Sequence, residues 1–143
     1  VTILVPVFNH WNETRTCLLS ILENTPETVD YEVIVADDCS DDDTRLLAEL
    51  TPGIRHIRHP QNLGFLRNCN EAAKHARGAY LLILNNDTQV QPGWLAPLLR
   101  RARKLSAREQ LQHEWRHRNR QGFWALFLAV ALGTALLAFL IGV

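Results

Sequence analysis

Apolar and polar residues alternate in blocks along the first two thirds of the chain. Three runs are apolar at most positions, which is typical of strands in a buried sheet: residues 1–7, 31–36 and 79–84. Residues 54–57, after the Pro52-Gly53 turn, are expected to form a further short strand. Three stretches with helical spacing or helix-start residues separate them: residues 11–23, 41–50 and 70–77. This alternation predicts an α/β fold with a Rossmann-like, mainly parallel sheet, right-handed crossovers and helices on both faces. Gly78 is expected to end the third helix.

The loops that follow these strands contain the residues best suited to binding. Ligands of parallel sheets collect at the carboxyl ends of the strands, which are followed here by Phe8-Asn9, Asp37-Asp38, residues 59–67 and Asn86-Asp87. The chain has neither a G-x-G-x-x-G motif nor a Walker A motif. A bound diphosphate would therefore need a divalent cation, Mg²⁺ or Mn²⁺, to neutralise it. We expect Asp87 to hold that cation and Asp38 to accept hydrogen bonds from a base or ribose.

The last 21 residues, 123–143, carry no charged side chain. As a helix they would be ~31 Å long, close to the ~30 Å hydrocarbon core of a bilayer. A buried core helix of this length would need a larger protein around it. We therefore predict one transmembrane helix over residues 123–143. Ala125, Ala129 and Gly133 recur every four residues, so a second helix is expected to pair with that face.

The net charge of zero conceals an uneven distribution. Residues 1–99 hold seven of the 15 Lys/Arg and 13 of the 15 Asp/Glu, a net charge of minus six, whereas residues 100–120 hold the other eight basic residues and two acidic ones. This pattern predicts a globular domain over residues 1–97, a basic juxtamembrane segment over 98–122, and then the apolar span. The excess of Lys/Arg before the span predicts a single-pass membrane protein whose N-terminal domain is cytoplasmic. The acidic domain beside the basic segment argues against a nucleic-acid partner.

The signals for zinc are weak. Three cysteines without a C-x-x-C motif favour neither a zinc site nor a disulfide framework, and they agree with a reducing compartment. Residues 113–117 read His-Glu-Trp-Arg-His, formally the H-E-x-x-H motif of metalloproteases. Such an enzyme needs a third ligand, and no ligand follows in the apolar tail. A metalloprotease is therefore the least favoured alternative.

Three segments match a known family in order and spacing. Residues 1–21 (VTILVPVFNHWNETRTCLLSI), 31–44 (YEVIVADDCSDDDT) and 62–95 (NLGFLRNCNEAAKHARGAYLLILNNDTQVQPGWL) resemble the nucleotide-binding half of family-two glycosyltransferases with the A-type fold. The resemblance covers about residues 1–97 and implies a nucleotide-sugar-binding domain there.

The resemblance also implies roles for individual residues. Pro6, Val7, Phe8 and Asn9 match the segment that contacts the nucleotide base, and Asp38 matches the residue that contacts uracil or its equivalent. Arg67 matches a basic residue near the diphosphate. Asn85-Asn86-Asp87 occupies the place of the family's D-x-D motif, which implies sugar-nucleotide binding by Asn86 and metal binding by Asp87. The two asparagines depart from the fully acidic form of the motif, which leaves the number of ligating carboxylates open.

These expectations together predict a metal-dependent glycosyltransferase. It would move a sugar from a nucleotide-diphosphate sugar to a glycan or lipid-linked acceptor in building a cell-envelope polysaccharide or glycolipid. No strands are predicted after Trp94-Leu95, and the acceptor-binding half with its catalytic base is not found; the chain also contains no methionine. We therefore expect it to be a piece of a longer protein. The alternative is a non-catalytic, membrane-anchored nucleotide-sugar-binding or scaffold fragment.

Overall fold

The computed structural model describes residues 1–51, 53–116, 126–132 and 134–142. The strands are β1 (Thr2–Val7), β2 (Glu32–Asp37), β3 (Arg55–Arg58), β4 (Tyr80–Ile83), β5 (Leu126–Leu132) and β6 (Thr134–Gly142). The helices are α1 (Trp11–Asn24), a 3₁₀ turn η1 (Asp43–Leu46), α2 (Leu47–Leu50), α3 (Phe65–Ala73) and α4 (Leu95–Arg116). All four predicted strands of the first two thirds are confirmed, to within one or two residues at each end.

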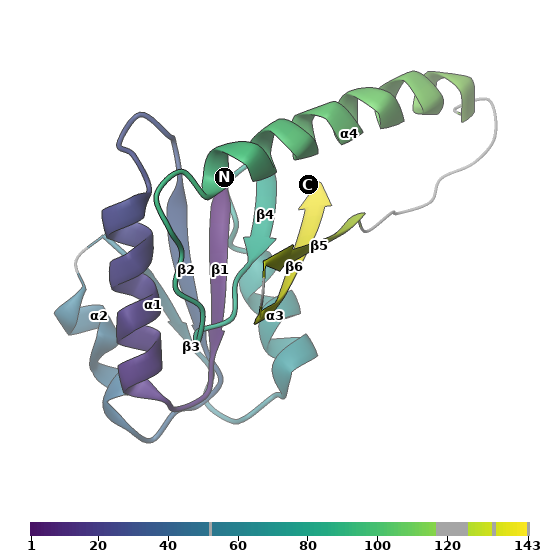
Figure 1. Ribbon diagram of the computed structural model, residues 1–143. Coiled ribbons are helices and arrows are strands. Elements are labelled where there is room, and N and C mark those ends of the chain that lie inside the picture. The colour runs from purple at the N-terminus through teal and green to yellow at the C-terminus, as the bar shows by residue number, and fades with distance from the viewer. Residues whose placement is uncertain (52, 117–125, 133, 143) are drawn as a thin grey trace.

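The strands form one sheet of order β3-β2-β1-β4-β6-β5 (Figure 1). The pairs β1–β2, β2–β3 and β1–β4 are parallel, as predicted, while β6 runs antiparallel to both β4 and β5. Parallel pairing brings the carboxyl ends of β1 to β4 to one edge of the sheet, the carboxyl edge. We call the opposite edge the amino edge.

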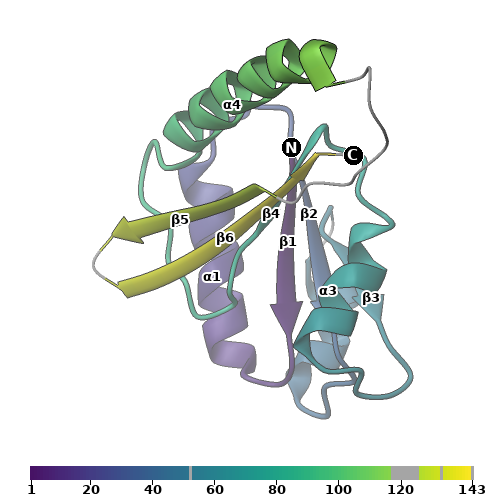
Figure 2. The same cartoon turned by 90° about the vertical axis from the view of Figure 1, so that its right-hand side faces the viewer.

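Successive residues of the central strands enter two separate cores. Ile3 and Val5 of β1 pack with residues of α1 on one face, whereas Leu4 between them packs with residues of α3 on the other. This alternation is the two-residue period of a strand, and it explains why β1 is apolar at almost every position. Figures 1 and 2 show α1 and α3 on opposite faces of the sheet. All six residues of β1 are buried, so this strand fixes the position of the loop that follows it.

The helix α3 differs from its prediction, because it spans Phe65–Ala73 and not residues 70–77. Gly64 precedes its first turn and provides no side-chain cap, so the Ser, Thr, Asp or Asn that commonly marks a helix start is missing. Gly78 does not end the helix. A Cβ added to Gly78 would lie 2.4 Å from the backbone nitrogen of Thr2, so glycine is needed there for close approach to the start of β1.

The predicted transmembrane helix over residues 123–143 is not what the structure shows. Residues 126–132 and 134–142 are the antiparallel strands β5 and β6, and β6 pairs with β4 through Leu140, Ile141 and Gly142. Figure 2 shows this hairpin alongside β4. In the described part of the chain, no helix is both long enough and apolar enough to cross a bilayer.

Unpaired backbone groups at the edge of β4 explain the difference. An unpaired strand edge presents free N–H and C=O groups, and β6 pairs with those of residues 80–82. An uninterrupted apolar run has no periodicity that separates a strand from a helix. The expected helix–helix face is not present either: Ala129 lies opposite Leu137 in the hairpin, while Ala125 and Gly133 fall outside the described residues. The expectation that no strand follows Leu95 was also wrong.

Candidate nucleotide-binding site

A hollow of about 400 Å³ lies at the carboxyl edge, where the loops after β1, β2, β3 and β4 meet. Its lining comprises the end of β1, the first residue after β2, the start of α3 with its preceding loop, and the two asparagines after β4. These residues are Pro6, Val7, Phe8, Asp38, Asn62, Gly64, Phe65, Asn68, Asn85 and Asn86. The hollow thus brings together five of the residues expected to bind a nucleotide sugar: Pro6, Val7, Phe8, Asp38 and Asn86. Asn9, Arg67 and Asp87 do not line it.

Backbone strain is concentrated in the loops after β1 and β2. Asn9, His10 and Cys39 all have positive φ angles, of 59°, 62° and 68°, a conformation that residues other than glycine rarely adopt. The two loops hold each other in place: the Asn9 N–H donates to Ser40 Oγ (2.8 Å), and Asn9 Oδ1 accepts from the Asp41 N–H (2.9 Å). Asn9 therefore acts on the loop after β2 and does not face the hollow. Strain of this kind is common at functional sites.

Asp37, at the end of β2, is a buried carboxylate that binds β3 and the loop after β2. Its side chain has no exposed surface, and it pairs with Arg58 Nη1 (2.8 Å) and His56 Nε2 (3.2 Å) from β3 and accepts from the Ser40 N–H (2.8 Å). Burial alone would raise the pKa of Asp37, but the hydrogen bonds from His56, Ser40 and Arg58 outweigh it and hold the pKa well below its usual range. Asp37 is therefore a carboxylate at neutral pH and fixes the loop that carries Asp38.

Asp38 is also buried, with 3% of its surface exposed. One carboxylate oxygen accepts from the Leu63 N–H (2.6 Å) and the other from the Gly64 N–H (2.9 Å). Asp38 thus ties the loop after β3 to the end of β2, directly before α3 begins. Gly64 has a φ of 79°, which glycine adopts without strain, and it sets the direction in which α3 starts. The structure gives Asp38 a positioning role that the sequence did not predict.

Sequence reasoning missed the contributions of Asn62, Gly64, Phe65 and Asn68. The loop 59–67 was expected at the carboxyl edge from its place after the third strand, but only Arg67 was singled out within it. Arg67 is exposed on α3 and does not line the hollow, and it takes part in none of the ion pairs found within residues 1–106. Phe8 and Phe65 are each 50% exposed and both line the hollow, so two aromatic rings flank it.

The turn that contains the two asparagines is held against α1. The Asn86 side chain donates to Thr14 Oγ1 (3.0 Å), and the Cys17 thiol lies 3.6 Å from the Asn85 carbonyl oxygen. Burial raises the pKa of the Cys17 thiol to about 12, and the negative charge of Asp87 adds to this shift, so the thiol stays neutral. The Thr88 N–H donates to the Asn85 carbonyl and closes the turn (3.2 Å). The asparagines therefore hold the turn in place.

The chain after this turn returns along α1. Ser20 Oγ accepts from the Val90 N–H (3.0 Å), the Asn24 amide donates to the Val90 carbonyl (3.2 Å), and the Trp94 indole donates to Thr25 Oγ1 (3.1 Å). Figure 1 shows the segment beside α1 before it enters α4. Because its backbone is fastened at several points, the position of the Asp87 turn is well defined.

Asp87 is exposed and follows Asn86, which lines the hollow. Its carboxylate makes none of the side-chain hydrogen bonds or ion pairs found within residues 1–106, and no group of three His, Cys, Asp or Glu in the described chain gathers around a possible metal position. A Mg²⁺ or Mn²⁺ ion that accompanies a nucleotide is typically held by one or two carboxylates, water and the phosphates themselves. One free carboxylate at the carboxyl edge fits that requirement.

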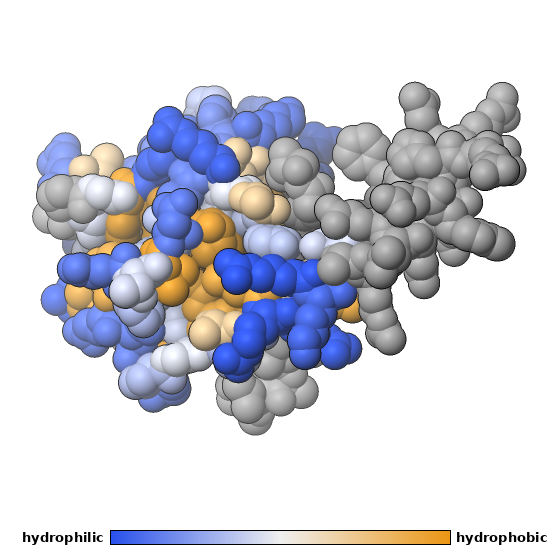
Figure 3. Space-filling model, turned by 90° about the horizontal axis from the view of Figure 1, so that it is seen from above, coloured by the Kyte–Doolittle hydropathy of each residue, from blue (hydrophilic) through white to orange (hydrophobic). Residues whose placement is uncertain are grey.

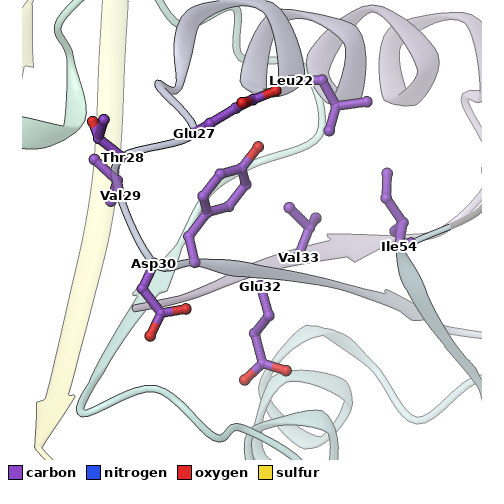
Figure 4. Close-up of a pocket in the computed structure, with 10 residues that line it drawn as sticks. Leu22, Glu27, Thr28, Val29, Asp30, Glu32, Val33 and Ile54 are labelled. Atoms are coloured by element: carbon purple, nitrogen blue, oxygen red, sulfur yellow. The ribbon is translucent and has the colours of Figure 1, made fainter.

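A larger hollow, of about 550 Å³, lies at the amino edge around the start of β2. Figure 3 looks onto the α4 end of the molecule, where apolar side chains lie beside hydrophilic ones. Figure 4 shows Leu22, Val33 and Ile54 around this hollow and the carboxylates of Asp30 and Glu32 on the other side of β2. Glu32 is engaged with Thr2, Arg55 and the Arg77 N–H. This hollow offers no group suited to an anionic diphosphate.

The family of the chain follows from comparison with known proteins. Residues 2–122 match the model of glycosyl transferase family 2, so the chain belongs to this family, as the resemblance implied. The structure is similar to that of S. aureus TarS residues 1–349 in complex with UDP-GlcNAc, with a TM-score of 0.55 and 27% identity over 60% of this chain and 26% of TarS 1–349. It is also similar to the mannosyltransferase PcManGT of Pyrobaculum calidifontis in complex with GDP-Man and Mn²⁺ (TM-score 0.52, 28% identity, 60% and 27% coverage).

Sequence relatives agree with the structural ones. The chain is 37% identical over 103 residues to the uncharacterized protein MT1568 of Mycobacterium tuberculosis. This alignment covers 71% of this chain and 32% of that protein. It is 34% identical over 106 residues to polypeptide N-acetylgalactosaminyltransferase 12 of Mus musculus, covering 70% of this chain and 18% of that enzyme. The chain therefore spans about a third or less of the length of these relatives.

Proposed function

We propose that residues 1–97 bind a nucleotide-diphosphate sugar together with Mg²⁺ or Mn²⁺ and serve as the donor-binding part of a glycosyltransferase. The observation that carries the proposal is the hollow at the carboxyl edge, lined by Pro6, Val7, Phe8, Asp38 and Asn86, together with the exposed Asp87, which directly follows Asn86 in the chain. The nucleotide sugars bound by TarS and PcManGT, and the Mn²⁺ bound by PcManGT, support the same ligand class for this chain.

Each group has a task in this proposal. Phe8 and Phe65 offer exposed ring faces for the base, and Asp87 would hold the cation beside the phosphates. When bound, the cation neutralises the charge that develops on the departing nucleoside diphosphate. Arg67, exposed on α3, is proposed to add positive charge near the same phosphates. No residue of this chain is assigned as the base that deprotonates the acceptor.

Calorimetry with UDP, GDP and dTDP, with and without Mn²⁺, tests this function. We expect at least one of the three to bind in a metal-dependent manner. Asp87→Ala should remove most of the metal-dependent part, because this residue supplies the carboxylate. The exposed Asp43, which no ligand is expected to reach, gives a matched control as Asp43→Ala. Equal affinity after chelation would contradict the metal role.

We propose a glycan or lipid-linked acceptor at the cytoplasmic face of a membrane, as for cell-envelope polysaccharides and glycolipids. Support comes from α4, whose outer side carries the exposed cations Arg100, Arg101, Arg103 and Lys104. Each is worth ~1 kcal/mol near anionic lipid. Figure 1 places α4 at the amino edge, so attachment there would leave the hollow at the carboxyl edge accessible. Cosedimentation with anionic but not neutral vesicles is expected; equal binding to both would contradict it.

The alternative from another class is a nucleotide-sugar-binding scaffold without transfer activity. It shares the hollow and the metal dependence, so binding measurements do not separate the two. Release of labelled sugar from a bound nucleotide sugar, to water or to an added acceptor, does so. Turnover that Asp87→Ala abolishes would support the transferase, and donor binding without any turnover in a longer chain that includes an acceptor half would support the scaffold.

A further inference from the structure

Thr14 connects two separate loops at the carboxyl edge. It lies in the first turn of α1 and has no exposed surface. The Thr14 hydroxyl donates to the His10 carbonyl oxygen (3.0 Å), and the same Oγ1 accepts from the Asn86 amide nitrogen (3.0 Å). A hydroxyl carries one donor and two acceptor lone pairs, so both bonds form at once. The loop after β1 and the turn after β4 are therefore joined through one oxygen atom.

The His10 end of this connection is a strained piece of backbone. Asn9 and His10 both have positive φ angles, and no side chain caps the start of α1 at His10. The His10 carbonyl accepts the Thr14 N–H (3.0 Å) as well as the Thr14 hydroxyl, so two bonds from α1 hold it. Phe8, which lines the hollow, lies two residues earlier in the chain. Thr14 thus helps to fix the loop that carries Phe8.

The Asn86 end fixes the direction of a side chain that lines the hollow. Because the Thr14 hydroxyl gives its hydrogen to His10, it offers only lone pairs to Asn86, and the NH₂ group of Asn86 must face it. Asp87 is the next residue, and the Thr88 N–H closes the turn on the Asn85 carbonyl (3.2 Å). In so short a turn, the orientation of Asn86 and the position of Asp87 are set together.

The other contact between α1 and this turn is weaker. The Cys17 thiol lies 3.6 Å from the Asn85 carbonyl oxygen, and a thiol is a weak donor. Ser20 and Asn24 bind the chain only further on, at Val90. Among the described residues, Thr14 therefore makes the strongest hydrogen bond between α1 and the turn that contains Asp87.

We propose that Thr14 is a positioning residue for the donor, an inference that rests on the proposed function. A nucleotide-diphosphate sugar has to reach two groups at once, with its base at Phe8 and its phosphates, through the cation, at Asp87. Thr14 holds the loop after β1 and the turn after β4 in one arrangement before the donor arrives. Groups that are ordered in advance bind more tightly, because binding does not have to order them. Since Thr14 is buried, it acts through His10 and Asn86.

The test measures how much Mn²⁺ the full chain needs to bind a nucleoside diphosphate. Calorimetry uses whichever of UDP, GDP and dTDP binds best, over a series of Mn²⁺ concentrations. Thr14→Val keeps the shape of the side chain and removes the hydroxyl. It is expected to need about fivefold more Mn²⁺ for half of the full effect, because freeing the turn costs no more than the hydrogen bond that held it. Thr14→Ser keeps the hydroxyl and should restore the wild-type requirement.

Thr16→Val is the matched control for the loss of a hydroxyl. Thr16 is exposed on the same helix, and its hydroxyl donates to the Asn12 carbonyl (2.8 Å), the same kind of bond within α1. Thr16→Val should therefore keep the wild-type Mn²⁺ requirement. A Thr14→Val chain that also keeps it overturns the inference, as does a Thr14→Ser chain that behaves like Thr14→Val.

A double variant shows whether Thr14 acts through Asn86. Neighbouring residues that act as one unit have effects that do not add. The chain with both Thr14→Val and Asn86→Ala should therefore need no more Mn²⁺ than Asn86→Ala alone. A further fivefold increase in the double variant would overturn the proposed connection.

Hydrogen exchange without any ligand separates this inference from the proposed function. The Thr88 amide, which closes the turn, should exchange faster in Thr14→Val than in the wild type and at the wild-type rate in Thr16→Val. Unchanged exchange in Thr14→Val overturns the inference whether or not a nucleotide binds. If no nucleoside diphosphate binds the wild-type chain, the proposed function fails and takes the donor role of Thr14 with it, even where faster exchange shows that Thr14 holds the turn.

Discussion

The two edges of the sheet differ in a way that hollow size does not reveal. The amino edge has the larger hollow, about 550 Å³ against 400 Å³, yet Glu27 and Asp30 beside it are exposed, and Glu32 is engaged with Thr2, Arg55 and the Arg77 N–H. The carboxyl edge has three non-glycine residues with positive φ, two buried aspartates and an unpaired buried oxygen on Asn68. Such features destabilise a fold, and they persist where binding requires them. Strain and unpaired polar atoms, more than volume, mark the site.

The largest expected effect comes from the anchor of the carboxyl edge. Asp37→Ala would leave Arg58 and the buried His56 without their common partner and free the Ser40 N–H. We expect a loss of about 3 kcal/mol in the free energy of unfolding, measured by urea denaturation. Glu71→Ala, which breaks an exposed pair with Lys74, is the control and should have no measurable effect. Equal stability of the two variants would show that the carboxyl edge is not held by Asp37.

At the amino edge, a single methyl group is expected to have the next largest effect. In Gly78→Ala, the new Cβ would lie 2.4 Å from the Thr2 nitrogen and 2.6 Å from the Val1 carbonyl carbon, so the backbone must shift. Overpacking of this kind costs about 1–3 kcal/mol. Gly53→Ala has open space around its Cβ but a φ of 94°, so it serves to separate steric overlap from backbone strain. Nucleotide preference should not change in either variant, because neither residue lies at the carboxyl edge.

Gly78, the buried strands and the tail show which parts of the structure the sequence could predict. The buried strands were predicted because β1, β2 and β4 are almost continuously apolar, and that pattern depends only on burial of both faces of the sheet. The sequence predicts a helix end at Gly78 because glycine commonly follows helices, whereas its real constraint is contact with Thr2, 76 residues away along the chain. The apolar tail predicts a helix because an unbroken apolar run does not show in its sequence that it pairs with β4.

For the site, the sequence could predict where the residues lie but not what each of them does. Topology alone places residues after parallel strands at one edge, so Phe8, Asp38 and Asn86 were expected there, and they line one hollow. Their roles depend on hydrogen bonds that the sequence does not encode locally. Asp38 is bound to the loop at Leu63 and Gly64, and Asn86 to Thr14, and only the folded chain brings these partners together.

Acid should weaken the carboxyl edge in a way that depends on Asp37. Its pKa in the folded chain is depressed, so the stabilisation is present above the unfolded pKa of about 3.9 and is lost as the pH falls toward the folded pKa. The slope from one proton is at most ~1.4 kcal/mol per pH unit. Urea denaturation between pH 5 and about pH 2.5 should therefore show a shallower loss in Asp37→Asn than in the wild type. Parallel curves would mean that Asp37 has the same pKa in both states.

The smallest effect on stability is expected from Asp38→Asn, which tests what Asp38 does at the carboxyl edge. The amide keeps one acceptor oxygen but turns an NH₂ group toward either the Leu63 or the Gly64 N–H, so one hydrogen bond is lost, at about 1 kcal/mol. The loop before α3 should loosen, which hydrogen exchange at the Leu63 and Gly64 amides would detect. The family resemblance also assigns Asp38 to the base, so UDP affinity measured by calorimetry with Mn²⁺ should fall as well. Unchanged exchange at both amides would mean that Asp38 does not hold this loop, and unchanged UDP affinity would mean that it does not contact the base.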